Sequence, residues 1–258
     1  GEELLPIRGV VRVLPNIAGF VGGDTVGCMV ATRFDQMEEL TLLIDIGTNG
    51  EMVLGDRRRR LACSTAAGPA FEGARISCGM RGVAGAVDHV TRQEGKISFH
   101  VLGDGQAKGL CGSGLLDLTA ALLEEGTIDE TGHLEGGAYC LSPGVTLTQK
   151  DVREMQLAKG AIRAGIELLA KELGAAVEDI RTVYLAGAFG NYLNPASACR
   201  IGMIPPVLAN RIVPIGNAAG EGAKLCAVSR EEFTYSQRLA ESTEFLELAS
   251  LPEFQDRF

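Results

Sequence analysis

The sequence predicts an α/β fold with a mixed sheet and surrounding helices, and three observations predict it. Apolar stretches alternate with short glycine-rich turns over the whole 258 residues, which is typical of strands and helices that alternate along the chain. Three short strands come before the first long helix, so part of the sheet must be antiparallel. Finally, 46% of the residues are hydrophobic, which is ample for a core.

The first predicted element is a meander over residues 40 to 64. Its three strands are expected at Leu40–Ile46, Glu51–Leu54 and Leu61–Ser64. The first connection contains Asn49-Gly50, a strong hairpin signal. A further short strand is expected at residues 97 to 102.

Helices are predicted from apolar periodicity between recognisable start and stop residues. One follows Gly114 and ends at Gly126, where glycine favours termination. The clearest begins near Thr148, which with Asp151 forms a capping-type start, and it runs to Leu173. Beyond it, a buried strand is expected at Thr182–Ala186 and a last helix from Ala218 through Leu225.

Composition excludes several classes of function. The net charge of −9 argues against nucleic-acid binding, which needs Lys and Arg against phosphates. The basic run Arg57–Arg60 is interpreted as a solvated turn. No apolar run is long enough for a membrane span, and the N-terminus does not resemble a signal peptide. We therefore expect a soluble, cytoplasmic protein.

The seven cysteines are spread along the chain without a closely spaced pair. This favours reduced thiols over disulfides or a zinc site. An iron–sulfur cluster normally needs a local run of cysteines, and the sequence has none. The histidines His89, His100 and His133 are equally scattered, and we interpret them as surface or core residues.

Asp45 raises the first question about function, because it interrupts an apolar strand in LLIDIGTNGEMVL. A buried carboxylate without a partner costs several kcal/mol, so Asp45 must meet a cation or lie where water and ligand reach it. The adjacent Gly47, Thr48, Asn49 and Gly50 can offer N–H and hydroxyl donors to phosphate, and Asp45 can hold Mg²⁺ through water. An ordinary hairpin in which Asp45 caps an amide is the alternative.

Three more glycine-rich stretches favour the phosphate interpretation. Gly112, Ser113 and Gly114 precede a helix, whose N-terminus attracts anions. Gly187, Ala188, Phe189 and Gly190 follow a buried strand and are small enough, apart from the phenylalanine, for a base or ribose to lie against the backbone. GNAAGEGAKL at residues 216 to 225 opens the last helix with three glycines.

The order of these motifs resembles the superfamily of acetate and sugar kinases, heat-shock chaperones and actin, in which two ribonuclease H-like halves clamp ATP. DIGTNGE is similar to the second phosphate loop of that superfamily, and LAGAFGN to its adenosine loop. PNIAGFVGGDTVGCMVAT and GNAAGEGA resemble its two connecting helices. CGSGLLD is similar to the nucleotide loop of the activators of 2-hydroxyacyl-CoA dehydratases.

A narrower resemblance covers residues 15 to about 225. AGFVGGDT, DIGTNGEMVLG, CSTAAGPAFEGARI with GMRG, CGSGLLD, TQKDVREMQLAKGAIRAGI, LAGAFGNYLN, IGMIP and GNAAGEGA together resemble the C-terminal ATPase domain of the reductive activators of corrinoid proteins. The resemblance implies an ATP-dependent activase that returns Co(II) corrinoid to Co(I) in a methyl-transferring protein. The implied partner is that corrinoid protein, and no nucleic acid or membrane is implied.

The resemblance also implies roles for the residues singled out above. Asp45 would orient the water of Mg²⁺, and Glu51 is a candidate base, with a solvent-facing strand residue as the alternative. Gly47, Thr48, Asn49 and Gly50 would receive the outer phosphates of ATP or ADP. The ribose and adenine would contact two further groups of residues: Gly112, Ser113 and Gly114, and Gly187, Ala188, Phe189 and Gly190.

The same resemblance divides the chain. Residues 1–40 are expected to form a connecting segment and helix, and residues 41–258 an actin-like C-terminal lobe with an insertion near 127–147. The cysteine-rich iron–sulfur segment and the first phosphate loop of the relatives are missing, so an isolated fragment is expected to be inactive. The apolar stripe of residues 151–173 is interpreted as core or as a homodimer contact. A small-molecule kinase and a nonenzymatic docking module for a corrinoid protein are the alternatives.

Overall fold

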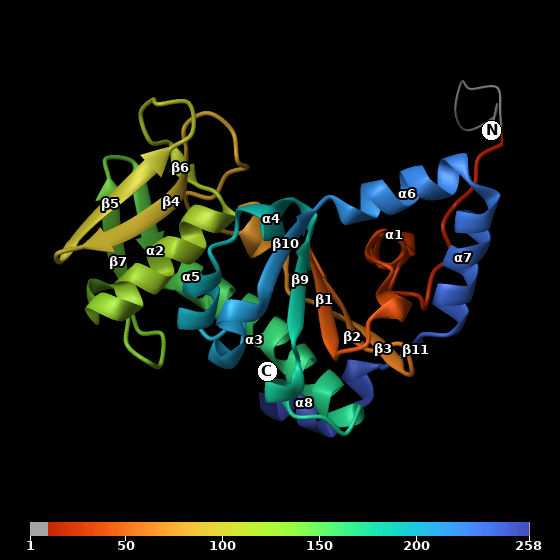
Figure 1. Ribbon diagram of the computed structural model, residues 1–258. Coiled ribbons are helices and arrows are strands. Elements are labelled where there is room, and N and C mark those ends of the chain that lie inside the picture. Colours follow the sequence, from red (N-terminus) through yellow and green to blue (C-terminus); the bar gives the residue numbers. More distant parts are fainter. Residues whose placement is uncertain (1–9, 258) are drawn as a thin grey trace.

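The computed structural model describes residues 10–257, without the side chains of residues 188, 191 and 255–257. Figure 1 shows two regions side by side. One is built on a large sheet with helices on both faces. The other, drawn in yellow and green, is formed mainly by the chain between the third and ninth strands.

The large sheet has six strands in the order β10-β9-β1-β2-β3-β11. Their bounds are Thr41–Ile46 for β1, Gly50–Gly55 for β2, Arg60–Thr65 for β3, Thr182–Ala186 for β9, Ile212–Gly216 for β10 and Glu244–Phe245 for β11. β1, β2 and β3 form the expected antiparallel meander, whereas β9 runs parallel to β1 and β10 parallel to β9. The prediction of a mixed sheet is therefore confirmed.

Successive residues of the central strands are buried on opposite faces of this sheet, as the period of a strand requires. In β1, Leu42, Ile44 and Ile46 join the core beneath α3 (Gln149–Glu172). Leu43 joins the second core, beneath α1 (Gly23–Thr32) and α6 (Ala218–Val228). Asp45 follows Leu43 by two positions and therefore faces the α1 side.

Two more helices complete these layers. α7 (Arg230–Glu241) packs against α1 and α6, and α8 (Pro252–Arg257) lies beside α3. The expected last helix at Ala218 is thus followed by two others. Its start is as predicted, because Asn217 caps it by accepting a hydrogen bond from the backbone N–H of Gly220.

The second region contains a three-stranded sheet, a helix and a hairpin. The strands are β4 (Ala86–Gln93), β5 (Lys96–Val101) and β6 (Gly109–Leu110), followed by α2 (Gly112–Glu125) and by the hairpin of β7 (Ala138–Ser142) and β8 (Val145–Thr148). The segment 127–147, expected as an insertion, includes β7. Short α4 (Gly187–Tyr192) and α5 (Pro195–Arg200) follow β9, and α5 packs on α2.

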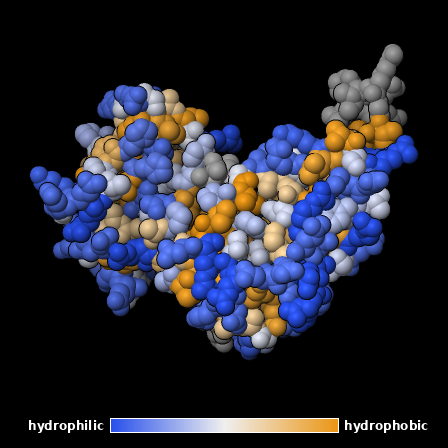
Figure 2. Space-filling model, in the orientation of Figure 1, coloured by the Kyte–Doolittle hydropathy of each residue, from blue (hydrophilic) through white to orange (hydrophobic). Residues whose placement is uncertain are grey.

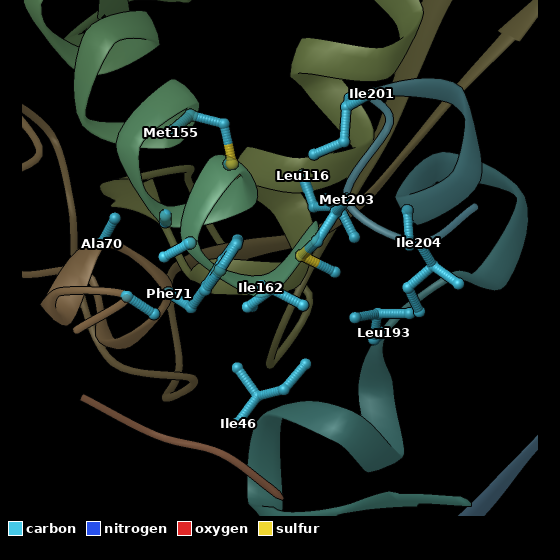
Figure 3. Close-up of a cluster of buried hydrophobic side chains, with 14 of the residues drawn as sticks. Ile46, Ala70, Phe71, Leu116, Met155, Ile162, Leu193, Ile201, Met203 and Ile204 are labelled. Atoms are coloured by element: carbon cyan, nitrogen blue, oxygen red, sulfur yellow. The ribbon is translucent and has the colours of Figure 1, made fainter. Parts of the chain in front are cut away.

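The α3 core continues from the large sheet into the second region. Figure 3 shows side chains from both regions meeting there, among them Ile46, Phe71, Leu116 and Ile162. Helix α3 starts as predicted, since Thr148 and Asp151 form a reciprocal capping box. Within the described residues, no helix has the length and apolar character to cross a membrane.

Candidate functional site

A cavity of about 690 Å³ lies between the large sheet and the second region. We call it the cleft. Figure 2 shows that the face turned to the reader is hollowed between the two regions. Segments far apart in the sequence line the cleft: Asp45, Ile46, Gly47, Phe71, Glu72, Met80, Arg81, Gly82, Asp88, Leu102, Cys111, Gly112, Ser113, Gly187, Phe189 and Tyr192. Three of the four glycine-rich stretches identified in the sequence contribute to this lining.

Asp45 stands at the carboxyl end of β1, where the sheet meets the cleft. Its Oδ2 atom lies 3.9 Å from Sγ of Cys28 on α1. Burial, and next the negative charge of Asp24, raise the pKa of Asp45 above its ordinary value. In the described structure this carboxylate has no cationic partner, so it is poised to meet a cation that comes with a ligand.

Gly187 leaves Asp45 the space it occupies. A Cβ atom built at Gly187 would lie 2.6 Å from Oδ1 of Asp45, and the residue has a φ of +86°, a backbone conformation that glycine adopts without strain. The glycine is therefore required twice, for the turn after β9 and for the position of the carboxylate.

Glu51 pairs with Asp45 across β1 and β2 and so lies on the same face of the sheet. Burial raises the pKa of Glu51 to about 7, and the charges of Asp24 and Asp45 add to the rise. A hydrogen bond from the side chain of Asn49 opposes it. A carboxyl group that titrates near neutral pH is suited to general base catalysis. However, Glu51 is not among the residues that line the cleft.

The turn between β1 and β2 presents only part of its predicted phosphate loop to the cleft. Gly47 lines the cleft, while its N–H donates to the carbonyl oxygen of Asn49 at 2.9 Å. Thr48 is exposed at the rim, and its hydroxyl donates to Oε1 of Glu72 at 2.5 Å. Asn49 is exposed, whereas Gly50 is buried in β2.

The N-terminus of α2 forms the opposite wall. Gly112 and Ser113 line the cleft, and in the described part of the chain the N-cap residue Cys111 makes no capping hydrogen bond with its side chain. Free N–H groups and the helix dipole favour an anion at this point. Gly114 instead packs against β4, because a Cβ atom there would overlap the carbonyl oxygen of Val87.

An aromatic pair forms the floor between these walls. Phe71 and Phe189 stack with ring centroids 4.5 Å apart and planes inclined by 20°. Gly112 has to be a glycine here, since a Cβ atom would overlap the carbonyl oxygen of Phe71 and lie 3.0 Å from the ring of Phe189. Gly190 is buried against Leu185. The side chain of Ala188 lies outside the described part of the structure.

Of the residues proposed from the sequence, Asp45, Gly47, Gly112, Ser113, Gly187 and Phe189 therefore share one cavity. Glu51, Asn49, Gly50, Gly114 and Gly190 lie next to those residues without lining it. Sequence reasoning singled out none of the charged residues Glu72, Arg81 and Asp88 or the aromatic Tyr192, which also line the cleft. Glu72, Arg81 and Tyr192 do lie within the stretches CSTAAGPAFEGARI, GMRG and LAGAFGNYLN that carry the family resemblance, but none of them received a role.

The donor set of the cleft fits a nucleotide better than a protein-held metal cluster. Its volume lies in the range of small-molecule sites, and one wall offers helix N–H groups. Within the described residues, no group of three or more His, Cys, Asp or Glu side chains is arranged to hold a metal ion. The cysteines are all free thiols and do not form an iron–sulfur ligand set. Mg²⁺ bound by one carboxylate and ligand phosphates needs no such group.

The chain is similar to known proteins along most of its length. A family model for the C-terminal domain of RACo, the ASKHA domain, matches residues 39–258. The chain is 36% identical over 284 residues to the corrinoid activation enzyme RamQ of Eubacterium limosum, covering 98% of this chain and 48% of that protein. It is 34% identical over 241 residues to the [Co(II) methylated amine-specific corrinoid protein] reductase of Methanosarcina barkeri, covering 85% of this chain and 44% of that protein.

A solved structure gives the same result. The reductive activator for corrinoid,iron-sulfur protein superposes with a TM-score of 0.87 at 34% identity, over 96% of this chain and 43% of that one. The chain thus spans less than half the length of the relatives it matches. The family and the fold expected from the sequence motifs are confirmed, and the chain belongs to the family of C-terminal ASKHA domains of RACo.

Proposed function

We propose that this chain is the ATP-binding domain of an ATPase-type activase that returns Co(II) corrinoid to Co(I) in a methyl-transferring corrinoid protein. The electron comes from an iron–sulfur domain outside this chain, since the described cysteines do not gather into a ligand set. The partner is the corrinoid protein, and the setting is the cytoplasm. A homodimer remains compatible with this function.

One observation carries the proposal: Asp45, Ser113 and Phe189, from three separate sequence motifs, line one cleft. Asp45 lies near the end of β1, Ser113 in the first turn of α2 after β6, and Phe189 in α4 after β9. The fold thus brings together residues that are 68 and 76 positions apart in sequence. Two similar proteins are named for their action on corrinoids or corrinoid proteins, and this supports a corrinoid protein as the partner.

The cleft suggests how a nucleotide is held. Asp45 holds the hydrated Mg²⁺, which neutralises phosphate charge when bound. Gly47 and Thr48 receive the outer phosphates, Gly112 and Ser113 offer the N–H groups of α2 to the ribose, and Phe189 supports the flat base. Glu51 pairs with Asp45 across β1 and β2, and we assign it the role of a base that polarises water.

Nucleotide binding acts here by positioning rather than by covalent catalysis. ATP cannot supply the electron. It can stabilise one arrangement of the activase and the corrinoid protein over another, by as much as its affinities for the two arrangements differ. The arrangement that it favours is the one in which cobalt is more easily reduced.

The test uses the full-length protein, a low-potential reductant and the cognate corrinoid protein, with cobalt oxidation state followed by absorbance. We expect MgATP to convert the Co(II) spectrum to that of Co(I). Asp45→Ala should weaken MgATP binding about 10- to 100-fold, as expected for loss of a charge-assisted contact. Asp56→Ala, at the far end of β2, is the control.

A spectrum that stays Co(II) with the wild-type protein would contradict the activase. Two other outcomes point to the alternatives. Phosphorylation of a sugar or acid by the full-length protein would favour a small-molecule kinase. Tight binding of the corrinoid protein without any binding of nucleotide would favour a docking module.

A further inference from the structure

Asp88 is a carboxylate of the cleft that lies outside every glycine-rich motif. It belongs to β4, and its side chain is only 14% exposed. The backbone on which it stands is held against α2, because the N–H of Cys111 donates to the carbonyl oxygen of Val87 at 3.1 Å. Asp88 is therefore placed beside the helix N-terminus formed by Gly112 and Ser113.

One histidine, His100, is hydrogen-bonded to this carboxylate, and a second, His89, lies beside it. Nδ1 of His100 lies 2.6 Å from Oδ1 of Asp88, and Nε2 of His89 lies 3.9 Å from its Oδ2. The two histidines face each other across β4 and β5. The other ring nitrogen of His89, Nδ1, lies 3.3 Å from Oδ2 of buried Asp117. The second oxygen of Asp117, Oδ1, accepts a 2.6 Å hydrogen bond from the hydroxyl of Ser197 on α5. Asp88 is thus the cleft end of a polar network rather than a loose surface acid.

The chemistry of the cleft limits what Asp88 can meet. Three of its four charged lining side chains in the described structure are carboxylates, namely Asp45, Glu72 and Asp88, and only Arg81 is cationic. A phosphate against Asp88 would be repelled. Asp88, His89 and His100 also do not form a metal-binding group. Of the groups that a nucleotide carries, a neutral hydrogen-bond donor therefore suits Asp88 best.

A ribose diol is the donor that fits a fixed carboxylate best, because two neighbouring hydroxyls can donate to its two oxygens. In dinucleotide-binding folds, an acidic side chain accepts a hydrogen bond from the ribose 2′-hydroxyl. If the base stacks on Phe189, the ribose attached to it, and not the base, is free to turn toward Asp88 on β4. We propose that Asp88 determines specificity for the sugar by accepting hydrogen bonds from both ribose hydroxyls, and this rests on the proposed nucleotide site.

The test is calorimetry on the full-length protein with MgATP, 2′-deoxy-ATP and 3′-deoxy-ATP. The wild type should bind ATP about 10-fold more tightly than either deoxynucleotide, the effect of one hydrogen bond to a charged group. Asp88→Ala should bind all three with nearly equal affinity. His100→Gln should reduce the ratio only in part, since His100 acts by positioning Asp88. Asp104→Asn, in an exposed loop nearby, should keep the wild-type ratio.

Several outcomes would overturn the inference while leaving the nucleotide site intact. These are a wild type without preference for ATP, or an Asp88→Ala variant that binds every nucleotide more weakly but keeps the ratio. A third is an Asp88→Ala variant that loses only a preference for ATP over inosine triphosphate, which would place the base at Asp88. Absence of any nucleotide binding to the wild type would instead remove the proposed function together with this inference.

Discussion

The two faces of the large sheet are packed by different means. Beneath α3, the core consists of long apolar side chains, such as Ile162 and Met52. On the other face, α1 and α6 cross so closely that a Cβ atom at Gly222 would overlap the carbonyl oxygen of Gly27. Side chains can turn into other rotamers, whereas touching backbones cannot. The second face is therefore the less adaptable one.

Asp45, the carboxylate that the large sheet contributes to the cleft, stands on this less adaptable face with its neighbour Glu51. Asp45 and Glu51 project toward α1, which carries Asp24 and Cys28 against them. Burying a carboxylate costs free energy. Such an unfavourable arrangement persists only where the surrounding structure holds it in place. The comparison indicates that the α3 face supplies stability and that the α1 face supplies fixed geometry.

The largest expected effect tests the α3 face. Ile162→Ala removes a fully buried side chain of α3 and should lower the free energy of unfolding by about 4 kcal/mol. Urea denaturation measures this change. Leu157→Ala, on the same helix but 49% exposed, should change stability by less than about 0.5 kcal/mol. Equal losses from both variants would contradict a stability role confined to the buried stripe.

The next prediction compares one substitution on both faces. Gly222→Ala sets a methyl group against the backbone of α1 and should cost about 3 kcal/mol, despite the better helix propensity of alanine. Gly165→Ala on α3 meets chiefly the terminal methyl of Met52, which can turn. We expect that variant to remain within about 1 kcal/mol of wild type.

Denaturation of the two glycine variants under identical conditions gives the difference directly. If Gly165→Ala proves as destabilising as Gly222→Ala, the distinction between adaptable and rigid packing fails. If Gly222→Ala is destabilised and also changes the pH dependence discussed below, the helix crossing positions Asp24 relative to Glu51.

The same contrast explains how much the sequence could predict. The meander, the presence of a hairpin between β1 and β2 and the start of α3 at Thr148 depend on neighbouring residues, and all were predictable. The turn itself lies at residues 47–49, because Gly50 already belongs to β2. Asp88 was not, because β4 exposes most of its second half and lacks a clear apolar alternation. Its approach to α2 depends on tertiary contacts.

Electrostatic properties of the site escaped the sequence for a related reason. The residue type of Glu51 and its place in a strand were visible. Its raised pKa arises from burial and from Asp24, which lies 27 positions earlier and reaches Glu51 only through the packing of α1. The stacking of Phe71 on Phe189 likewise joins residues that no local pattern connects.

The smallest of the three effects concerns Glu51 and depends on pH. Its pKa in the folded protein is about 7, against an ordinary value near 4.3 in the unfolded chain. As pH rises, the carboxyl of Glu51 therefore loses its proton at a lower pH in the unfolded chain than in the folded protein. The folded state loses stability as pH rises between about 4.5 and 7. Glu51→Gln removes the loss and should stabilise the protein by about 2 kcal/mol at pH 8, after allowance for partial exposure.

Equilibrium denaturation of wild type and Glu51→Gln at pH 5 and pH 8 measures this difference. The two proteins should differ little at pH 5, where Glu51 is protonated in the folded state. Glu241→Gln, at the exposed end of α7, controls for loss of a negative charge and should show no such pH dependence. A Glu51→Gln variant with the wild-type pH profile would mean that Asp24 and burial leave this carboxyl unperturbed, so the α1 face would hold no proton near neutrality.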